Sequence, residues 1–310
     1  MTEIKTGANK TMNKYLVTAG QGLGNQIETI PLIEWLIQHD IDIDVCYCHR
    51  PKIDGDPGKS KVLEMYCDKR NIPFEISDNG KVEFPEHYEG QLVGCWTAPR
   101  KGVYICAQAN RSYTNEIMAN MDILRQMKLT DNVTDCLAEV MPLEWECGVG
   151  HDIVLCNGGF NTDKWRRKKY PHFEQLAEML HILGYSVVSV GRKDEYIPGT
   201  VDKTEIGMVE TAEIIANSRM GIFTDSGWYH WKGLIGGKGI ALFTATNVKK
   251  NYHPLAYPEI TVMQKGLKCQ PCQSETWECT EMWHRCTQWR CQDIEPKKIV
   301  KNVQKILKIT

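Results

Sequence analysis

The second half of the chain alternates short apolar runs with segments in which apolar residues recur every three or four positions. The apolar runs at 151–156, 185–190, 221–223 and 239–243 predict strands, and the segments at 173–183 and 211–218 predict amphipathic helices. Strands that alternate with helices of this length form parallel sheets with helices packed on both faces. We therefore predict an α/β unit of the Rossmann type in this half.

The first half shows the same alternation less regularly. Residues 15–19 predict a strand, Gly20, Gly22 and Gly24 a flexible loop, and the apolar positions between 27 and 37 one face of a following helix. Further strands are predicted at 41–48, 73–76, 91–95 and 103–106, and helices at 57–70 and 113–127. We interpret 129–150 as the passage between two domains and 295–309 as an amphipathic helix that closes the chain.

The segment GIFTDSGWYHWKGLIG at 221–236 predicts a strand, a tight turn and the N-terminus of a helix. Free N–H groups and the positive end of the helix dipole make such an N-terminus a seat for an anion, although Asp and Ser are also ordinary helix caps. The loops 157–171, 224–228 and 244–247 each follow a predicted strand, so they should meet at one edge of the sheet. Their cationic side chains, helix N-terminus and hydroxyl groups together predict a diphosphate site.

Composition narrows the class of protein. The chain has 310 residues, 42% of them hydrophobic, which is typical of a soluble globular protein of two domains. Its net charge of −2 provides no global basic field for nucleic acid or an anionic membrane. No apolar run approaches the roughly 20 residues of a membrane span, and the N-terminal residues lack the apolar region of a signal peptide. We therefore expect an intracellular, cytoplasmic protein.

Five of the 13 cysteines are crowded near the C-terminus. They are Cys269, Cys272, Cys279, Cys286 and Cys291, with His284 among them. A Cys-x-x-Cys pair presents two thiolates to one metal ion, and two further ligands would complete a tetrahedral site. The spacing predicts a metal finger with zinc as the default ion, without deciding which ligands bind, and packed reduced thiols are the alternative. Trp277, Trp283 and Trp289 lie among basic residues here, a combination that suits a sugar or single-stranded nucleic acid.

Four segments resemble, in order, the family 9 glycosyltransferases, the bacterial heptosyltransferase family. They are GLGNQIETIPLIEWL at 22–36, KWRRKKYPHFEQLAEML at 164–180 with VVSVG at 187–191, TAEIIANSRMGIFTDSGWYHWKGLIGGKGIALFTAT at 211–246, and LKCQPC at 267–272. The resemblance implies an α/β GT-B fold, in which two Rossmann-like domains with parallel sheets face each other across a cleft. It also implies inverting transfer of a heptose or hexose from a nucleotide diphosphate donor, usually ADP-linked, to a hydroxyl of a glycan or protein.

The same resemblance gives the expected domain boundaries. The acceptor domain covers 1–145, the nucleotide-sugar donor domain 146–266, the cysteine-rich finger 267–293 and the closing helix 294–310. Heptosyltransferases that modify autotransporter proteins carry a cysteine-bound iron finger, so the resemblance places iron beside zinc as the metal of this segment.

The resemblance also assigns a donor site. The residues concerned are Gly24, Lys168, Asp225, Ser226, Gly227, His230, Thr244 and Thr246. Lys168 matches a lysine that contacts the donor phosphates, a task that suits a flexible point charge. Asp225 is expected either to accept from a sugar hydroxyl or to cap the helix, and His230 either to contact the donor or to be satisfied by neighbouring backbone. The two threonines follow the pattern of a further phosphate-side loop.

The family commonly carries an aspartate, its proposed base, where this chain has Asn25. An asparagine cannot take up a proton at neutral pH, so Asn25 can only orient a substrate. Glu28 lies three residues along the same predicted helix and hence on nearly the same face. We predict Glu28 as the catalytic base, with an exposed helix glutamate as the alternative interpretation.

Two other functions stay open at this point. A glycosyltransferase that modifies a hydroxymethylated base in DNA would share the donor site and differ only in its acceptor. A non-catalytic nucleotide-sugar binding protein would explain Asn25 without any other base.

Overall fold

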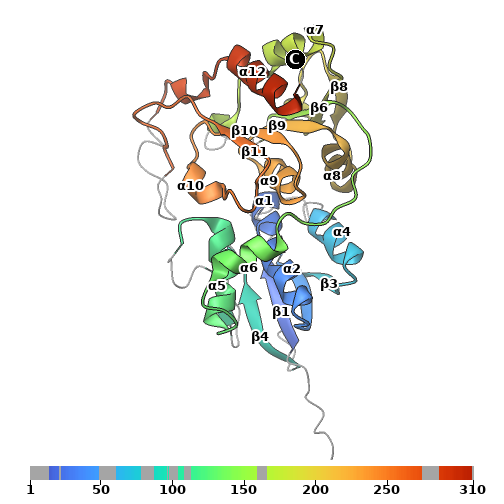
Figure 1. The fold of residues 1–310 in the computed structure, drawn as a ribbon, viewed down its shortest axis with the longest axis vertical. Coiled ribbons are helices and arrows are strands. Elements are labelled where there is room, and N and C mark those ends of the chain that lie inside the picture. The colour runs from blue at the N-terminus through green and yellow to red at the C-terminus, as the bar shows by residue number, and fades with distance from the viewer. Residues whose placement is uncertain are drawn as a thin grey trace, which may run out of the picture.

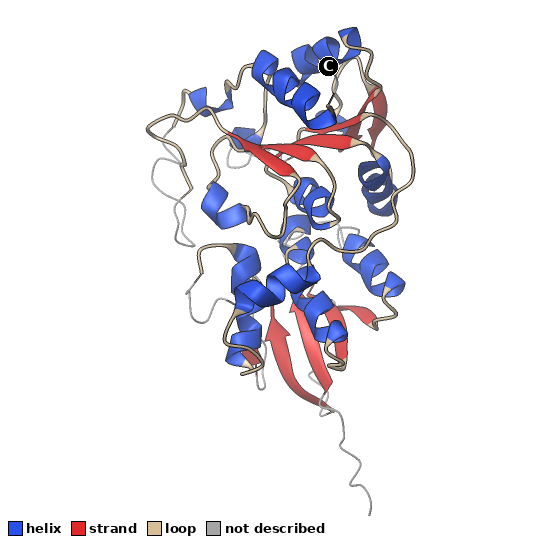
Figure 2. Ribbon diagram, viewed as in Figure 1, coloured by secondary structure: helices blue, strands red, loops and turns tan. Residues whose placement is uncertain are grey.

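The computed structural model describes residues 14–20, 22–48, 61–77, 87–95, 97, 104–107, 113–158, 166–273 and 286–308. Two parallel sheets organise these residues, one in each half of the chain (Figures 1 and 2). Within the described ranges, no helix combines the length and apolar character that crossing a membrane requires.

The N-terminal sheet has the strand order β3-β2-β1-β4-β5 with parallel pairing throughout. Its strands are β1 (Lys14–Ala19), β2 (Ile43–Cys48), β3 (Phe74–Ser77), β4 (Tyr88–Val93) and β5 (Tyr104–Cys106). The helices of this half are α1 (Leu23–Ile27), α2 (Ile30–Gln38), α4 (Lys61–Lys69), α5 (Glu116–Gln126) and α6 (Val133–Val140). The strand order reverses between β1 and β4, and the glycine-containing loop before α1 leaves β1 at this point.

The C-terminal sheet has the order β11-β10-β9-β6-β7-β8 and is also parallel. Its strands are β6 (Ile153–Cys156), β7 (Val187–Gly191), β8 (Val201–Thr204), β9 (Met220–Thr224), β10 (Gly239–Leu242) and β11 (Ile260–Met263). The α-helices of this half are α7 (Phe173–Ile182), α8 (Met208–Asn217), α9 (Gly227–Leu234), α10 (Val248–Asn251) and α12 (Pro296–Leu307). Alternate residues of the strands pack against α7 and α12 on one face and against α8 and α9 on the other, as parallel sheets require (Figure 1).

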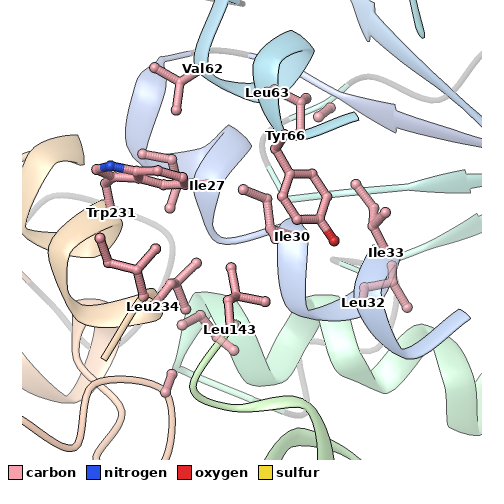
Figure 3. Close-up of a cluster of buried hydrophobic side chains, with 14 of the residues drawn as sticks. Ile27, Ile30, Leu32, Ile33, Val62, Leu63, Tyr66, Leu143, Trp231 and Leu234 are labelled. Carbon is pink, nitrogen blue, oxygen red and sulfur yellow. The ribbon is translucent and has the colours of Figure 1, made fainter. Parts of the chain in front are cut away.

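One apolar core runs through both halves. Ile27 and Ile30 of the N-terminal half, with Tyr66 of α4, belong to the same buried cluster as Trp231 and Leu234 of α9 (Figure 3). In Figure 1, α1 and α9 lie between the two sheets. The contact between the halves is therefore made by packed side chains of a continuous core.

Several elements differ from the sequence predictions. The helix expected over 27–37 is divided into α1 and α2 because Pro31, at the start of α2, has no N–H to continue the hydrogen-bond ladder of α1. The expected passage at 129–150 contains α6, and β8 and β11 have no counterpart in the prediction. Residues 57–60 and 103, placed in a helix and a strand by the pattern, lie outside the described residues.

Candidate active site

The strand order of the C-terminal sheet reverses between β6 and β9, so the loops that follow these strands leave the sheet side by side. Ligands of open α/β sheets bind at such a position. Thr224 Oγ1 donates to the carbonyl oxygen of Gly158 over 2.8 Å and ties the two loops together. Lys168, carried by the 3₁₀ helix η3 (Arg166–Lys168), places its Nζ 3.0 Å from Asp225 Oδ2 at the end of β9. The structure thus brings together two predicted donor residues that are far apart in sequence.

Asp225 is buried and has several polar neighbours. Asn251 Nδ2 donates to Asp225 Oδ2 over 3.2 Å. Burial alone would raise the pKa of Asp225, but the Lys168 ammonium, His230 and the Thr246 hydroxyl lower it below its usual value. The carboxylate is therefore ionised at neutral pH and can accept a hydrogen bond from a substrate hydroxyl.

The N-terminus of α9 lies directly after this carboxylate. Ser226 is the N-cap residue, and its buried hydroxyl lies beside the Cys156 thiol without a hydrogen bond of normal geometry among the described residues. A Cβ on Gly227 would lie 2.6 Å from Leu23 Cγ and 2.9 Å from the backbone nitrogen of Gly24. Only glycine fits at 227, because the start of α1 approaches the start of α9 so closely.

The two threonines of the loop after β10 have different surroundings. Thr244 Oγ1 donates to the carbonyl oxygen of Arg167 over 2.7 Å, so its hydroxyl proton is used to hold η3 next to Lys168. Thr246 is fully buried and its hydroxyl lies near Asp225. Thr244 therefore supports the loop that carries the lysine, and Thr246 supports the carboxylate.

His230 of α9 points at the N-terminal half. Its Nδ1 lies 2.5 Å from the Tyr257 hydroxyl and 3.5 Å from Glu28 Oε1, so both of these neighbours are side chains. A Cβ on Gly24 would lie 3.5 Å from His230 Cδ2, which places the glycine loop against the ring. Burial lowers the pKa of His230 to about 3. The imidazole is neutral at physiological pH and can donate from one nitrogen and accept at the other.

Glu28 follows α1 as its C-cap residue and is 2% exposed, so the interpretation of it as an exposed helix glutamate is wrong. Burial, then the carboxyl groups of Glu116 and Asp225, raise the pKa of Glu28 well above its usual range, and Lys250 offsets only part of this effect. Lys250 Nζ lies 3.6 Å from Glu116 Oε1, and both of these side chains are buried. Glu28 is thus a carboxyl group held between the halves in surroundings that favour its protonated form.

Asn25 lies in α1, one turn before Glu28, and is partly buried. Its backbone oxygen accepts from Thr29 Oγ1 over 2.9 Å. Sequence reasoning missed Glu116, Lys250 and the Tyr257 hydroxyl, because no motif surrounds them and their elements meet Glu28 and His230 only in the folded chain.

The cysteine-rich segment is described in part. Cys272 and Cys291 are buried and pack against Ala245. Among the residues that the structure describes, no three His, Cys, Asp or Glu side chains lie together as a metal site would require. Cys279 lies outside the described residues, as do His284, Trp277 and Trp283. The described thiols alone therefore do not form the predicted metal finger.

Comparison with known proteins gave matches among solved structures only. No protein-family model matches the chain, and a search of curated proteins also found no match. A family 9 glycosyltransferase from Veillonella parvula superposes with a TM-score of 0.65 at 15% identity, over 98% of this chain and 100% of the other. The ADP-heptose LPS heptosyltransferase II of Escherichia coli gives 0.59 at 14% identity, over 95% and 98%.

A third similar structure is the iron-containing dodecameric glycosyltransferase TibC from enterotoxigenic Escherichia coli. It gives a TM-score of 0.62 at 11% identity, over 96% of this chain and 77% of TibC. A second structure of TibC, in complex with ADP-D-β-D-heptose, gives 0.58. The chain therefore has the GT-B fold of the family 9 glycosyltransferases.

Proposed function

We propose that the protein is an inverting glycosyltransferase that moves a heptose or hexose from a nucleotide diphosphate sugar to a hydroxyl group of a glycan or protein. The observation that carries this proposal is the Lys168–Asp225 pair at the N-terminus of α9, where the strand order of the C-terminal sheet reverses. Glu28 and His230 lie within 3.5 Å of each other beside it, one from each half of the chain. Cation, helix N-terminus and carboxyl groups are the parts that glycosyl transfer from a diphosphate needs.

The donor would be held by two kinds of contact. The Lys168 ammonium and the free N–H groups of the first turn of α9 suit the diphosphate, because both place positive charge where the leaving group gains negative charge. The Asp225 carboxylate, ionised and buried, suits a hydroxyl of the sugar. Phosphate would compete with Asp225 for Lys168, so donor binding includes a rearrangement of this ion pair.

The proposed transfer is a single displacement at the anomeric carbon. The acceptor oxygen forms a bond to C1, the bond from C1 to the phosphate oxygen breaks, and the nucleoside diphosphate leaves with the electron pair. The proton of the acceptor hydroxyl passes to the ionised form of the Glu28 carboxyl, which must be deprotonated before the transfer. Burial raises the pKa of Glu28, so its ionised form is a stronger base than an exposed glutamate, while a smaller fraction of the chains carries that form at neutral pH.

The donor nucleotide is proposed to be ADP-linked. Support comes from the fold that this chain shares with TibC, whose structure in complex with ADP-D-β-D-heptose is known.

We also propose that the reaction takes place in the cytoplasm. Most of the described cysteines are buried as small side chains of the core, which is a usual role of cysteine in a reducing compartment.

Incubation of the protein with nucleotide sugars and a panel of glycan, protein and hydroxymethylated DNA acceptors tests the proposal. We expect release of ADP from ADP-heptose that depends on an acceptor. Glu28→Gln should abolish this release while leaving donor binding in place. Binding of the donor without turnover on any acceptor would instead indicate a non-catalytic binding protein, and unchanged turnover in Glu28→Gln would exclude Glu28 as the base.

A metal ion at the cysteine-rich segment stays a prediction from the Cys269–Cys272 spacing, and no step of the proposed transfer involves it. Elemental analysis of protein purified under reducing conditions checks it. We expect about one zinc or iron ion per chain. A preparation that is folded and metal-free would contradict the prediction.

A further inference from the structure

The turn at 269–273 is attached to the loop that follows β10. The backbone N–H groups of Cys272 and Gln273 both donate to the carbonyl oxygen of Ala245, over 3.0 and 3.2 Å. Cys272 is buried with Cys291 against the Ala245 side chain. The position of Gln273 is therefore fixed by backbone hydrogen bonds and by packing at the same point.

The side chain of Gln273 reaches both ends of α10. Its Oε1 accepts from the backbone N–H of Asn247 over 2.9 Å and from Asn251 Nδ2 over 3.2 Å. Asn251 Nδ2 also donates to Asp225 Oδ2 over 3.2 Å. A primary amide nitrogen has two protons, and here one is directed at Gln273 and the other at Asp225.

These contacts fix the rotation of the Asp225 carboxylate. Its Oδ2 accepts a hydrogen bond from Asn251 Nδ2 of α10 and lies 3.0 Å from Lys168 Nζ of η3. Without the acceptor on Gln273, the Asn251 amide would be free to turn away from Asp225. Lys168 would still be present beside the carboxylate, so the charge of the site would not change.

We infer that Gln273 is a positioning residue of the donor site, which acts through Asn251 to orient Asp225 towards the donor sugar. The inference rests on the proposed function and deepens it, because it separates recognition of the sugar from recognition of the diphosphate. The cysteine-rich segment, which carries Gln273, thereby becomes part of the donor site.

Calorimetric titration of the full chain with ADP and with ADP-heptose, and in parallel with UDP and UDP-glucose, tests the inference. In Gln273→Leu we expect affinity for the nucleotide sugar to fall about tenfold, as loss of one hydrogen bond to a charged group predicts, while affinity for the free nucleotide stays within about twofold. Gln273→Glu should restore sugar-nucleotide binding, because its carboxylate keeps the acceptor. Gln175→Leu, the same change at an exposed position of α7, is the matched control.

A double variant shows whether Gln273 affects nucleotide-sugar binding through Asp225 or through a general disturbance of the structure. Gln273→Leu combined with Asp225→Asn should bind the nucleotide sugar no more weakly than Asp225→Asn alone. Equal losses for nucleotide and nucleotide sugar, additive losses in the double variant, or no loss in Gln273→Leu would each overturn the inference. Failure of the unmodified chain to bind either nucleotide or its sugar would overturn the proposed function, and the inference with it.

Discussion

At the scale of single residues, burial sets the protonation of three side chains where the two halves meet. Burial disfavours charge, so it raises the pKa of Glu28 and lowers that of His230. Asp225 is equally buried but stays ionised, because Lys168 lies 3.0 Å from it. The same desolvation therefore acts on two carboxyl groups with opposite results: Glu28 is shifted towards its protonated form, whereas Asp225 beside Lys168 stays ionised.

Glu28→Gln should stabilise the protein more at high pH than at low pH. The pKa of Glu28 in the folded chain is raised above its unfolded value of about 4.3, so its contribution to stability is complete below that value and is lost as pH rises towards the folded-state pKa. Glutamine has no such proton to lose. Urea unfolding at pH 5 and pH 8 measures the effect. The unfolding free energy of Glu28→Gln, relative to that of the native chain, should be higher at pH 8 than at pH 5.

The matched control for this measurement is Glu174→Gln, which removes an exposed carboxylate at the start of α7. A difference between Glu28→Gln and the native chain that is the same at both pH values would contradict the assignment of a raised pKa to Glu28.

Lys168→Met should destabilise the chain even without a donor. It leaves the buried Asp225 carboxylate without its cation, and loss of one partner of a largely buried pair costs about 3 kcal/mol. Asp225→Asn in the same chain should recover part of this loss, because the neutral amide no longer needs a counter-charge. Urea unfolding of both single variants and the double variant measures this coupling. If the losses of unfolding free energy in the two single variants add up exactly to the loss in the double variant, the Lys168–Asp225 pair does not contribute to stability.

At the scale of elements, one side chain joins a helix of the first half to a helix of the second. Asn115 is the N-cap of α5, and its Oδ1 accepts from the backbone N–H of Met118 over 3.2 Å. Its Nδ2 lies within 3.4 Å of the carbonyl oxygens of Lys249, Lys250 and Tyr252, at the end of α10. The start of one helix thus satisfies the carbonyl groups at the end of the other.

Asn115→Asp and Asn115→Ala should separate these two roles. Aspartate keeps the cap oxygen but loses the amide donor, so it should weaken only the contact with α10, whereas alanine loses both and should cost about 1 kcal/mol more. Hydrogen exchange should show lower protection at the end of α10 in both variants and at the start of α5 only in Asn115→Ala. The same pattern in the two variants would contradict the assignment.

At the scale of the whole molecule, one apolar core is shared by the two halves, and we expect them to unfold together. Trp231 of α9 is completely buried, its ring lies among Ile27 and Ile30 (Figure 3), and its Nε1 donates to the carbonyl oxygen of Ala212 over 3.1 Å. The contact across the halves therefore combines a buried apolar core with polar contacts such as those of Asn115 and of Glu28 with His230.

Trp231→Ala should therefore lower the unfolding free energy by about 3–5 kcal/mol, the usual cost of removing a buried aromatic ring. Amides of β1 and of β9 should lose hydrogen-exchange protection together, in a single cooperative transition. Tyr196→Ala, which removes an aromatic ring that is 42% exposed, is the control and should have little effect. Loss of protection in β9 alone would contradict a shared core.

The sequence by itself determined the α/β class and the strands whose following loops meet at one edge of the sheet. Apolar runs of three to six residues become β6, β9 and β10 because these strands are covered on both faces and need apolar side chains throughout. β8 was not predicted because it is an edge strand with the largely polar sequence VDKT. It forms a strand through its pairing with β7, which the apolar pattern does not reveal. Since parallel strands end at one edge, the convergence of Lys168 on Asp225 followed from the strand pattern.

The tertiary structure alone decided the environment of Glu28. Its sequence neighbours permit an exposed helix residue, but Glu116 of α5, Lys250 of α10 and His230 of α9 surround it in the folded chain. The same holds for Gln273, which reaches Asp225 only through Asn251. Local patterns determine which residues form strands and helices, because backbone geometry repeats along the chain. Proton affinity and orientation depend on neighbours from other elements, and only the packing of both halves brings those neighbours together.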